Sequence, residues 1–109
     1  MNRYGREQLR RIFEALELPK NTRFRGYVIM NGVDERYLID LVPEGLLWSN
    51  RPDDAIVLKK HKKAIELKKL AEEDNVGIGL LFETDELILP LAEDAVRDVL
   101  FSVNQSSKR

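Results

Sequence analysis

Two carboxylates and a lysine in the middle of the chain have a spacing that suits metal-dependent chemistry. Asp53 follows Pro52, and Glu66 and Lys68 flank a leucine further along. If residues 54–59 and 64–69 form a hairpin, the side-chain period of two places Glu66 and Lys68 on one face, with Asp53 entering beside them. Carboxylate oxygens suit Mg²⁺, so Asp53 and Glu66 are candidate metal ligands. Lys68 would orient or help deprotonate a bound water for attack on a phosphodiester, which makes Asp53, Glu66 and Lys68 a candidate catalytic set.

The segment from Pro52 to Lys68 resembles the PD-(D/E)XK nuclease superfamily. In that superfamily Pro-Asp begins one catalytic strand, and an acid, any residue and a lysine lie on the next. The resemblance implies a helix leading into a small sheet, with Mg²⁺ as the cofactor of nucleic-acid cleavage. In a second alignment Asp40 would be the first acid, but no lysine motif follows it.

A helix over residues 61–74 is the competing interpretation of the same segment, and we favour it. Ala64, Leu67, Leu70 and Ala71 fall on one helical stripe, and alanine, lysine, glutamate and leucine are strong helix formers. In a helix Glu66 and Lys68 point in different directions, so the metal motif is lost.

Basic residues are concentrated just before and within this segment. Residues 59–69 carry six positive and one negative side chain, whereas residues 70–107 carry one and nine. A helix here would place lysines at its positive dipole end, with Glu72, Glu73 and Asp74 at the other, against the macrodipole at both ends. Lysines beside unpaired helix-start amides suit a phosphate. The candidate nucleic-acid-binding residues are Lys59, Lys60, Lys62, Lys63, Arg6 and Arg10.

The elements around this segment predict a small α+β domain. An amphipathic helix over residues 3–18, capped by Asn2, precedes strands 24–30 and 33–42, which flank Asn31-Gly32. Asn-Gly is typical of a two-residue hairpin turn, which would pair Met30 with Val33 and place Arg23 opposite Asp40 in an ion pair. A short strand around Trp48 follows.

The second half predicts a parallel crossover and a final helix. Strand 55–58, helix 61–74 and strand 76–82 would form a βαβ unit in a mixed sheet, followed by an edge strand at 87–89. Gly77 and Gly79 would allow close strand packing. Pro90 suits the first residue of the last helix. The apolar face of that helix comprises Ala92, Ala95, Val96, Val99, Leu100 and Val103.

Length and composition favour one soluble domain over residues 1–103, with a flexible tail at 104–109. The chain has no cysteine, and its single histidine, His61, is expected to be solvated within a lysine run. No stretch of about 18 apolar residues occurs, which favours a cytoplasmic protein without membrane contact.

Two classes of function fit these features. The first is a small nucleic-acid-associated module with a nuclease-like fold, and nested beside it is a metal-dependent nuclease that acts through Asp53, Glu66 and Lys68. The alternative is a protein-binding or regulatory module without enzymatic activity, forming a homodimer through the apolar face of the last helix.

Overall fold

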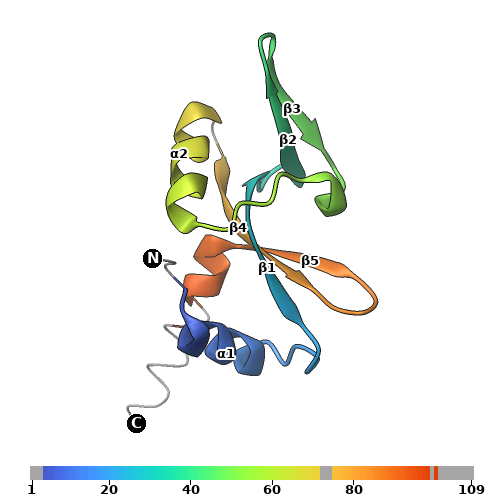
Figure 1. Cartoon of the computed structure of the whole chain (residues 1–109), viewed down its shortest axis with the longest axis vertical. Helices are drawn as coiled ribbons and strands as arrows, with labels where there is room; N and C mark the ends of the chain where they lie inside the picture. The colour runs from blue at the N-terminus through green and yellow to red at the C-terminus, as the bar shows by residue number, and fades with distance from the viewer. Residues whose placement is uncertain (1–3, 72–74, 99, 101–109) are drawn as a thin grey trace.

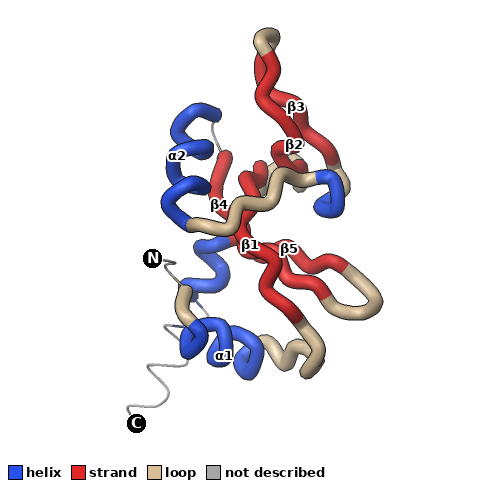
Figure 2. The backbone as a smooth tube through the Cα atoms, viewed as in Figure 1, coloured by secondary structure: helices blue, strands red, loops and turns tan. Residues whose placement is uncertain are grey.

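A computed structural model describes residues 4–71, 75–98 and 100. The strands form one antiparallel sheet in the order β3-β2-β1-β4-β5, so the α+β class is confirmed (Figures 1 and 2). The elements are α1 (Arg6–Ala15), β1 (Arg23–Asn31), β2 (Arg36–Val42), β3 (Gly45–Ser49), the 3₁₀ turn η1 (Pro52–Asp54), α2 (His61–Ala71), β4 (Val76–Glu83) and β5 (Ile88–Ala92). Residues 93–98 are helical.

Alternation along the two central strands divides the core between the faces of the sheet. Tyr27 and Ile29 of β1 face the larger cluster, to which the helices contribute Ile12, Ala64 and Val96. Val28 faces a smaller cluster on the opposite side, which the segment after η1 covers with Ala55 and Val57. The helices therefore share one face of the sheet, while the β2–β3 hairpin projects away from the body (Figure 1).

The predicted parallel crossover exists only in reduced form. The predicted mixed sheet is wrong, because every strand pair among the described residues is antiparallel. Residues 55–58 are not a strand. Leu58 makes a single antiparallel bridge to Tyr27, with N–H···O distances of 2.7 and 2.8 Å in the two directions. Both this segment and β4 run antiparallel to β1, so α2 still joins two parallel segments, with β1 between them.

The predicted hairpin exists, but its register differs by four residues. Met30 pairs with Tyr37 rather than with Val33. The Asn31 side chain accepts hydrogen bonds from the N–H groups of Val33 and Asp34, and Glu35 takes the left-handed conformation with φ of 53°. A four-residue loop therefore replaces the two-residue turn, because the asparagine oxygen binds the loop backbone itself.

The last helix begins later than predicted. Pro90 lies in β5, where it pairs with Leu81, and the helical residues start at Glu93. Proline is tolerated on an edge strand where its missing N–H would face outward. Of the predicted apolar face, Val96 is buried, Leu100 is partly buried and Ala92 and Ala95 are exposed. Val99 and Val103 lie outside the described residues, as do Asn2 and the tail 104–109.

No helix in the described part of the chain is long and apolar enough to cross a membrane. Trp48 lies in the short strand β3, as the sequence predicts, and it is partly buried. Gly79 allows close packing, since a Cβ there would lie 2.6 Å from Sδ of Met30 and 3.2 Å from Cγ2 of Val28, whereas Gly77 has open space around it.

Gly26 is the position at which the Tyr27–Leu58 bridge depends on glycine. Its φ is +143°, and a Cβ there would lie 2.6 Å from the Leu58 carbonyl oxygen. We expect Gly26→Ala to lower the free energy of unfolding by about 1–3 kcal/mol, because it adds both backbone strain and a clash. Urea unfolding measures this change. Gly77→Ala is the matched strand control and should change stability by less than about 1 kcal/mol; equal effects would contradict the role assigned to Gly26.

Glu83 replaces Asp40 as the partner of Arg23. Its carboxylate accepts hydrogen bonds from Arg25 at 2.7 Å and Arg23 at 3.2 Å. The hydrogen bond from Arg25 is the main cause that holds the pKa of Glu83 below its ordinary value. The pair therefore stabilises the fold at neutral pH, and this contribution is lost as the pH falls through the lowered pKa.

This ion pair gives a pH-dependent prediction. Glu83→Gln should lose less stability between pH 7 and pH 3 than the wild type, because it no longer carries the carboxylate that must be protonated. Urea midpoints at the two pH values measure the difference. Glu86→Gln, on the neighbouring loop, is the control and should follow the wild type. A Glu83→Gln profile parallel to that of the wild type would show that the pair does not contribute.

Candidate functional site

The three predicted catalytic residues lie on two different elements. Asp53 is in η1, exposed, with its carboxylate 3.3 Å from the guanidinium of Arg51. It borders an open hollow together with Glu83 at the end of β4 and with Asp85 and Glu86 of the β4–β5 connection, and α2 contributes no residue to that hollow. Among the described residues, no group of three or more acids or histidines is placed to hold a metal ion.

Glu66 and Lys68 lie on α2, so the predicted hairpin over residues 54–69 is wrong and the favoured helix is confirmed for residues 61–71. Two helical residues differ by about 200° around the axis, which separates these side chains. The Glu66 carboxylate is 3.4 Å from the ammonium of Lys63, and Lys68 borders a different pocket. The catalytic and metal-binding roles of Asp53, Glu66 and Lys68 stay a prediction.

A buried polar cluster joins α2 to the helix at 93–98. His61 is 5% exposed, so the prediction of a solvated histidine is wrong. Its Nε2 lies 2.6 Å from Oε2 of Glu93, which is 8% exposed. The other carboxylate oxygen of Glu93 accepts a hydrogen bond of 3.3 Å from Arg97. Both oxygens of a buried acid are therefore partnered, as low-polarity surroundings require.

Aromatic rings enclose the other sides of His61. The ring of Tyr27 on β1 lies 5.1 Å from the imidazole, edge to face, and the ring of Tyr4 lies 6.2 Å from it. Tyr4 lies two residues before Arg6, the first residue of α1, whereas His61 is the first residue of α2. The imidazole thus connects the starts of two helices to the centre of the sheet.

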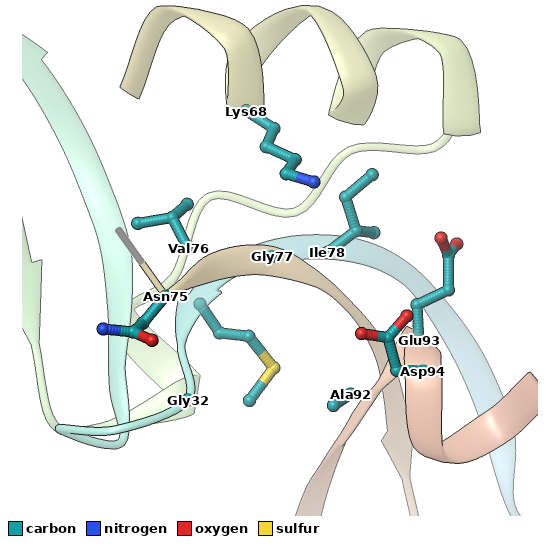
Figure 3. Close-up of a pocket in the computed structure, with 10 residues that line it drawn as sticks. Gly32, Lys68, Asn75, Val76, Gly77, Ile78, Ala92, Glu93 and Asp94 are labelled. Atoms are coloured by element: carbon teal, nitrogen blue, oxygen red, sulfur yellow. The ribbon is translucent and has the colours of Figure 1, made fainter. Parts of the chain in front are cut away.

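A pocket of about 250 Å³ lies next to this cluster, between α2, β4 and residues 92–94 (Figure 3). It exists because β4 extends further than β5: the pairing with β5 ends at Gly79–Ala92, and no other strand in the described part of the chain pairs with residues 76–78 on that edge. Lys68 extends from α2 over it, and Glu93 and Asp94 lie at one end of it, with Asn75 and Val76 at the other (Figure 3). Cationic and anionic groups therefore face one space.

The predicted basic residues at α2 are all exposed, but they differ in what they contact. Lys59 donates a hydrogen bond of 3.0 Å to the carbonyl of Arg25, and Lys63 pairs with Glu66. Lys60 and Lys62 have no ion pair within the described residues. The first turn of α2 contains no acid, as predicted, but its last turn contains Lys68 and Lys69, which suit the dipole. Glu72, Glu73 and Asp74 lie outside the described residues.

The two predicted arginines of α1 also differ. Arg10 contacts Glu7 at 2.6 Å and Glu14 at 2.7 Å, so much of its charge is compensated locally. The hydrogen bond from Arg10 holds the pKa of Glu7 below its ordinary value. Arg6 is exposed and makes no ion pair within the described chain. Both arginines border a mostly apolar hollow of about 350 Å³ whose other lining residues are Leu9, Phe13, Thr22 and Phe24.

Comparison of the chain with protein-family models, with curated proteins and with solved structures finds no match. Its function is therefore inferred from its own side chains.

The His61–Glu93 pair is the feature that sequence reasoning missed. His61 precedes Ala64 by three residues and Ala71 by ten, so it continues the buried stripe of α2 toward its start. Glu93 likewise precedes Val96 by three. This spacing was the available signal, but lysines on both sides of His61 favoured a solvated interpretation.

Glu93 gives a direct test of this cluster. Glu93→Ala should destabilise the fold by about 1–3 kcal/mol, because it leaves His61 and Arg97 without their carboxylate partner in a buried place. Chemical unfolding measures the loss. Asp94→Ala is the control, since Asp94 is adjacent but exposed, and should change stability by less than about 0.5 kcal/mol. Comparable losses would contradict a structural role specific to Glu93.

Proposed function

We propose that this chain is a nucleic-acid-binding module that contacts phosphates through the lysines at the start of α2. The observation that carries the proposal is the position of His61. Its burial fixes the first residue of α2 against the sheet, while Lys60, Lys62 and Lys63 on either side of it remain exposed. A rigid helix start presenting several cations is what a phosphate backbone requires.

Arg6 extends the same surface. The contact between the rings of Tyr4 and His61 brings the start of α1 close to the start of α2. Arg6 lies two residues after Tyr4, in the first turn of α1. The two helix starts are therefore neighbours although Arg6 and His61 are 55 positions apart in the sequence.

The charge arrangement of α2 supports this function. Lys62 and Lys63 lie in a first turn that has no acid. A cation at the positive end of a helix costs about 0.3–1 kcal/mol at low ionic strength. An anion bound there would remove the cost and contact the free amides of the first turn as well.

The apolar hollow on α1 favours a single strand over a duplex. Arg6 and Arg10 border it, and Phe13 and Phe24 contribute aromatic surface. An unpaired base can stack on such a surface while its phosphate meets an arginine. In a duplex the bases are not available for this contact.

A matched pair of triple variants tests the proposal. The variant with Lys60, Lys62 and Lys63 all changed to Gln should bind single-stranded oligonucleotides more weakly and with a flatter dependence of log affinity on log salt. The slope should fall by about 0.7 per lost phosphate contact. Fluorescence anisotropy at several salt concentrations, on single strands and duplexes, measures it. Lys59 is left unchanged because its ammonium binds the backbone of Arg25.

The control removes the same charge elsewhere. Lys20, Lys68 and Lys69 changed together to Gln give an identical change of net charge, so only the location differs. This control should retain most of the affinity. If the two triple variants weaken binding equally, the attraction is a general effect of charge; if the wild type binds neither form of nucleic acid, the proposal is wrong.

A further inference from the structure

We infer that the free edge of β3 is a dimerisation surface, on which a second copy of this chain adds its own β3 antiparallel about a two-fold axis at Leu47. The inference rests on the outward direction of backbone N–H and C=O groups of β3, on exposed leucines, and on the opposite charges at the two ends of the strand. It is independent of nucleic-acid binding.

Hydrogen bonds inside the sheet show which β3 groups face outward. The Leu38 carbonyl accepts a hydrogen bond from the Ile56 N–H, so the peptide groups of Leu38 point toward the β1 side of β2. Leu38 is therefore not hydrogen-bonded to its β3 partner Trp48. The N–H and C=O groups of Trp48, and by alternation those of Leu46, point to the open edge. These two residues supply the donors and acceptors for another strand.

The two outer edges of the sheet are built differently. On the opposite edge, Pro90 is the central residue of β5. The N–H and C=O groups of Tyr27 are hydrogen-bonded to Leu58, so they point away from Leu80, its partner on β4. The N–H and C=O groups of Leu80 therefore point toward Leu91 on β5. The next position on β5 faces outward, and there Pro90 has no N–H to donate. Proline there blocks strand addition. β3 has the sequence Gly-Leu-Leu-Trp-Ser, with neither proline nor charge.

Exposed apolar side chains lie on the edge strand β3 and on its neighbour β2. Leu47 is 44% exposed on one face of the hairpin, and Leu41 is 40% exposed on the other, beside Leu46. In Figure 1 this hairpin stands away from the helices, so the edge is accessible. Burying these side chains is the main gain that association would offer.

The register follows from the outward groups, and it makes the strand complementary to itself. Leu46 of one copy would pair with Trp48 of the other, twice, around a central pair of Leu47 side chains. Each end of the strand would also meet its opposite charge, because Glu44 precedes β3 and Arg51, which also contacts Asp53 of its own chain, follows it. A parallel arrangement would instead place like charges together, so the two-fold arrangement is favoured.

Leu47→Lys tests this interface with little risk to the fold. Leu47 pairs with Asp40 across β2, so a lysine there gains an acidic neighbour within the monomer. At the two-fold axis, however, two lysines would lie directly opposite each other, which is unfavourable. Sedimentation velocity over a concentration series should show a monomer–dimer equilibrium for the wild type and monomer alone for Leu47→Lys. Leu87→Lys, at a leucine that is 52% exposed beside β5, is the control and should dimerise as the wild type does.

A charge exchange tests the antiparallel register. Glu44→Arg alone should weaken the dimer, because it places two arginines at each end of the paired strands. Glu44→Arg combined with Arg51→Glu should restore it, because the opposite charges meet again with their positions exchanged. A monomeric wild type at millimolar concentration, a dimer that survives Leu47→Lys, or a double variant no better than Glu44→Arg would each overturn the inference.

Discussion

The reciprocal pair of backbone hydrogen bonds between Tyr27 and Leu58 determines most of what surrounds it. It holds residues 56–58 between β1 and β2, which share only two residue pairs near their turn before they separate. It requires Gly26, whose φ and lack of a side chain let the Leu58 carbonyl approach. It also places His61, three residues after Leu58, in edge-to-face contact with the ring of Tyr27. The start of α2 and the exposed lysines around it therefore depend on one bridge.

The elements could be predicted from the sequence because each has a strong local pattern. The apolar stripe of α2, the hairpin around Asn31 and the strand at residues 76–83 all have the expected type of structure. The register of the hairpin could not be predicted, because Asn31 directs its side chain at its own loop, and Asn-Gly is compatible with both outcomes. The position of residues 56–58 between β1 and β2 could not be predicted either, because a bridge of one residue leaves no alternating pattern of apolar residues in the sequence.

Only the exposed part of the candidate site, the lysines at the start of α2, could be predicted from the sequence. Lysines grouped in sequence stay grouped on a helix start, so the basic surface follows from local spacing. The buried half joins His61 to Glu93 and Tyr4, which are distant in the chain, and only the folded domain brings them together. Lysines beside a histidine suggest solvent, but a helix has two faces and His61 lies on the inner one. The position of Pro90 was predicted wrongly for a similar reason, because proline suits both the first residue of a helix and the outer side of an edge strand.

Pro90 also has a consequence for the size of any assembly built on this sheet. A sheet with two pairing edges adds copies without limit, as fibres do, because each new copy offers a fresh template. Here the proline leaves β5 without the donor that a further strand would need. Growth through the outer strands is thus possible in one direction only, and two copies joined at β3 present only their β5 edges to a third. The assembly would therefore stop at two copies.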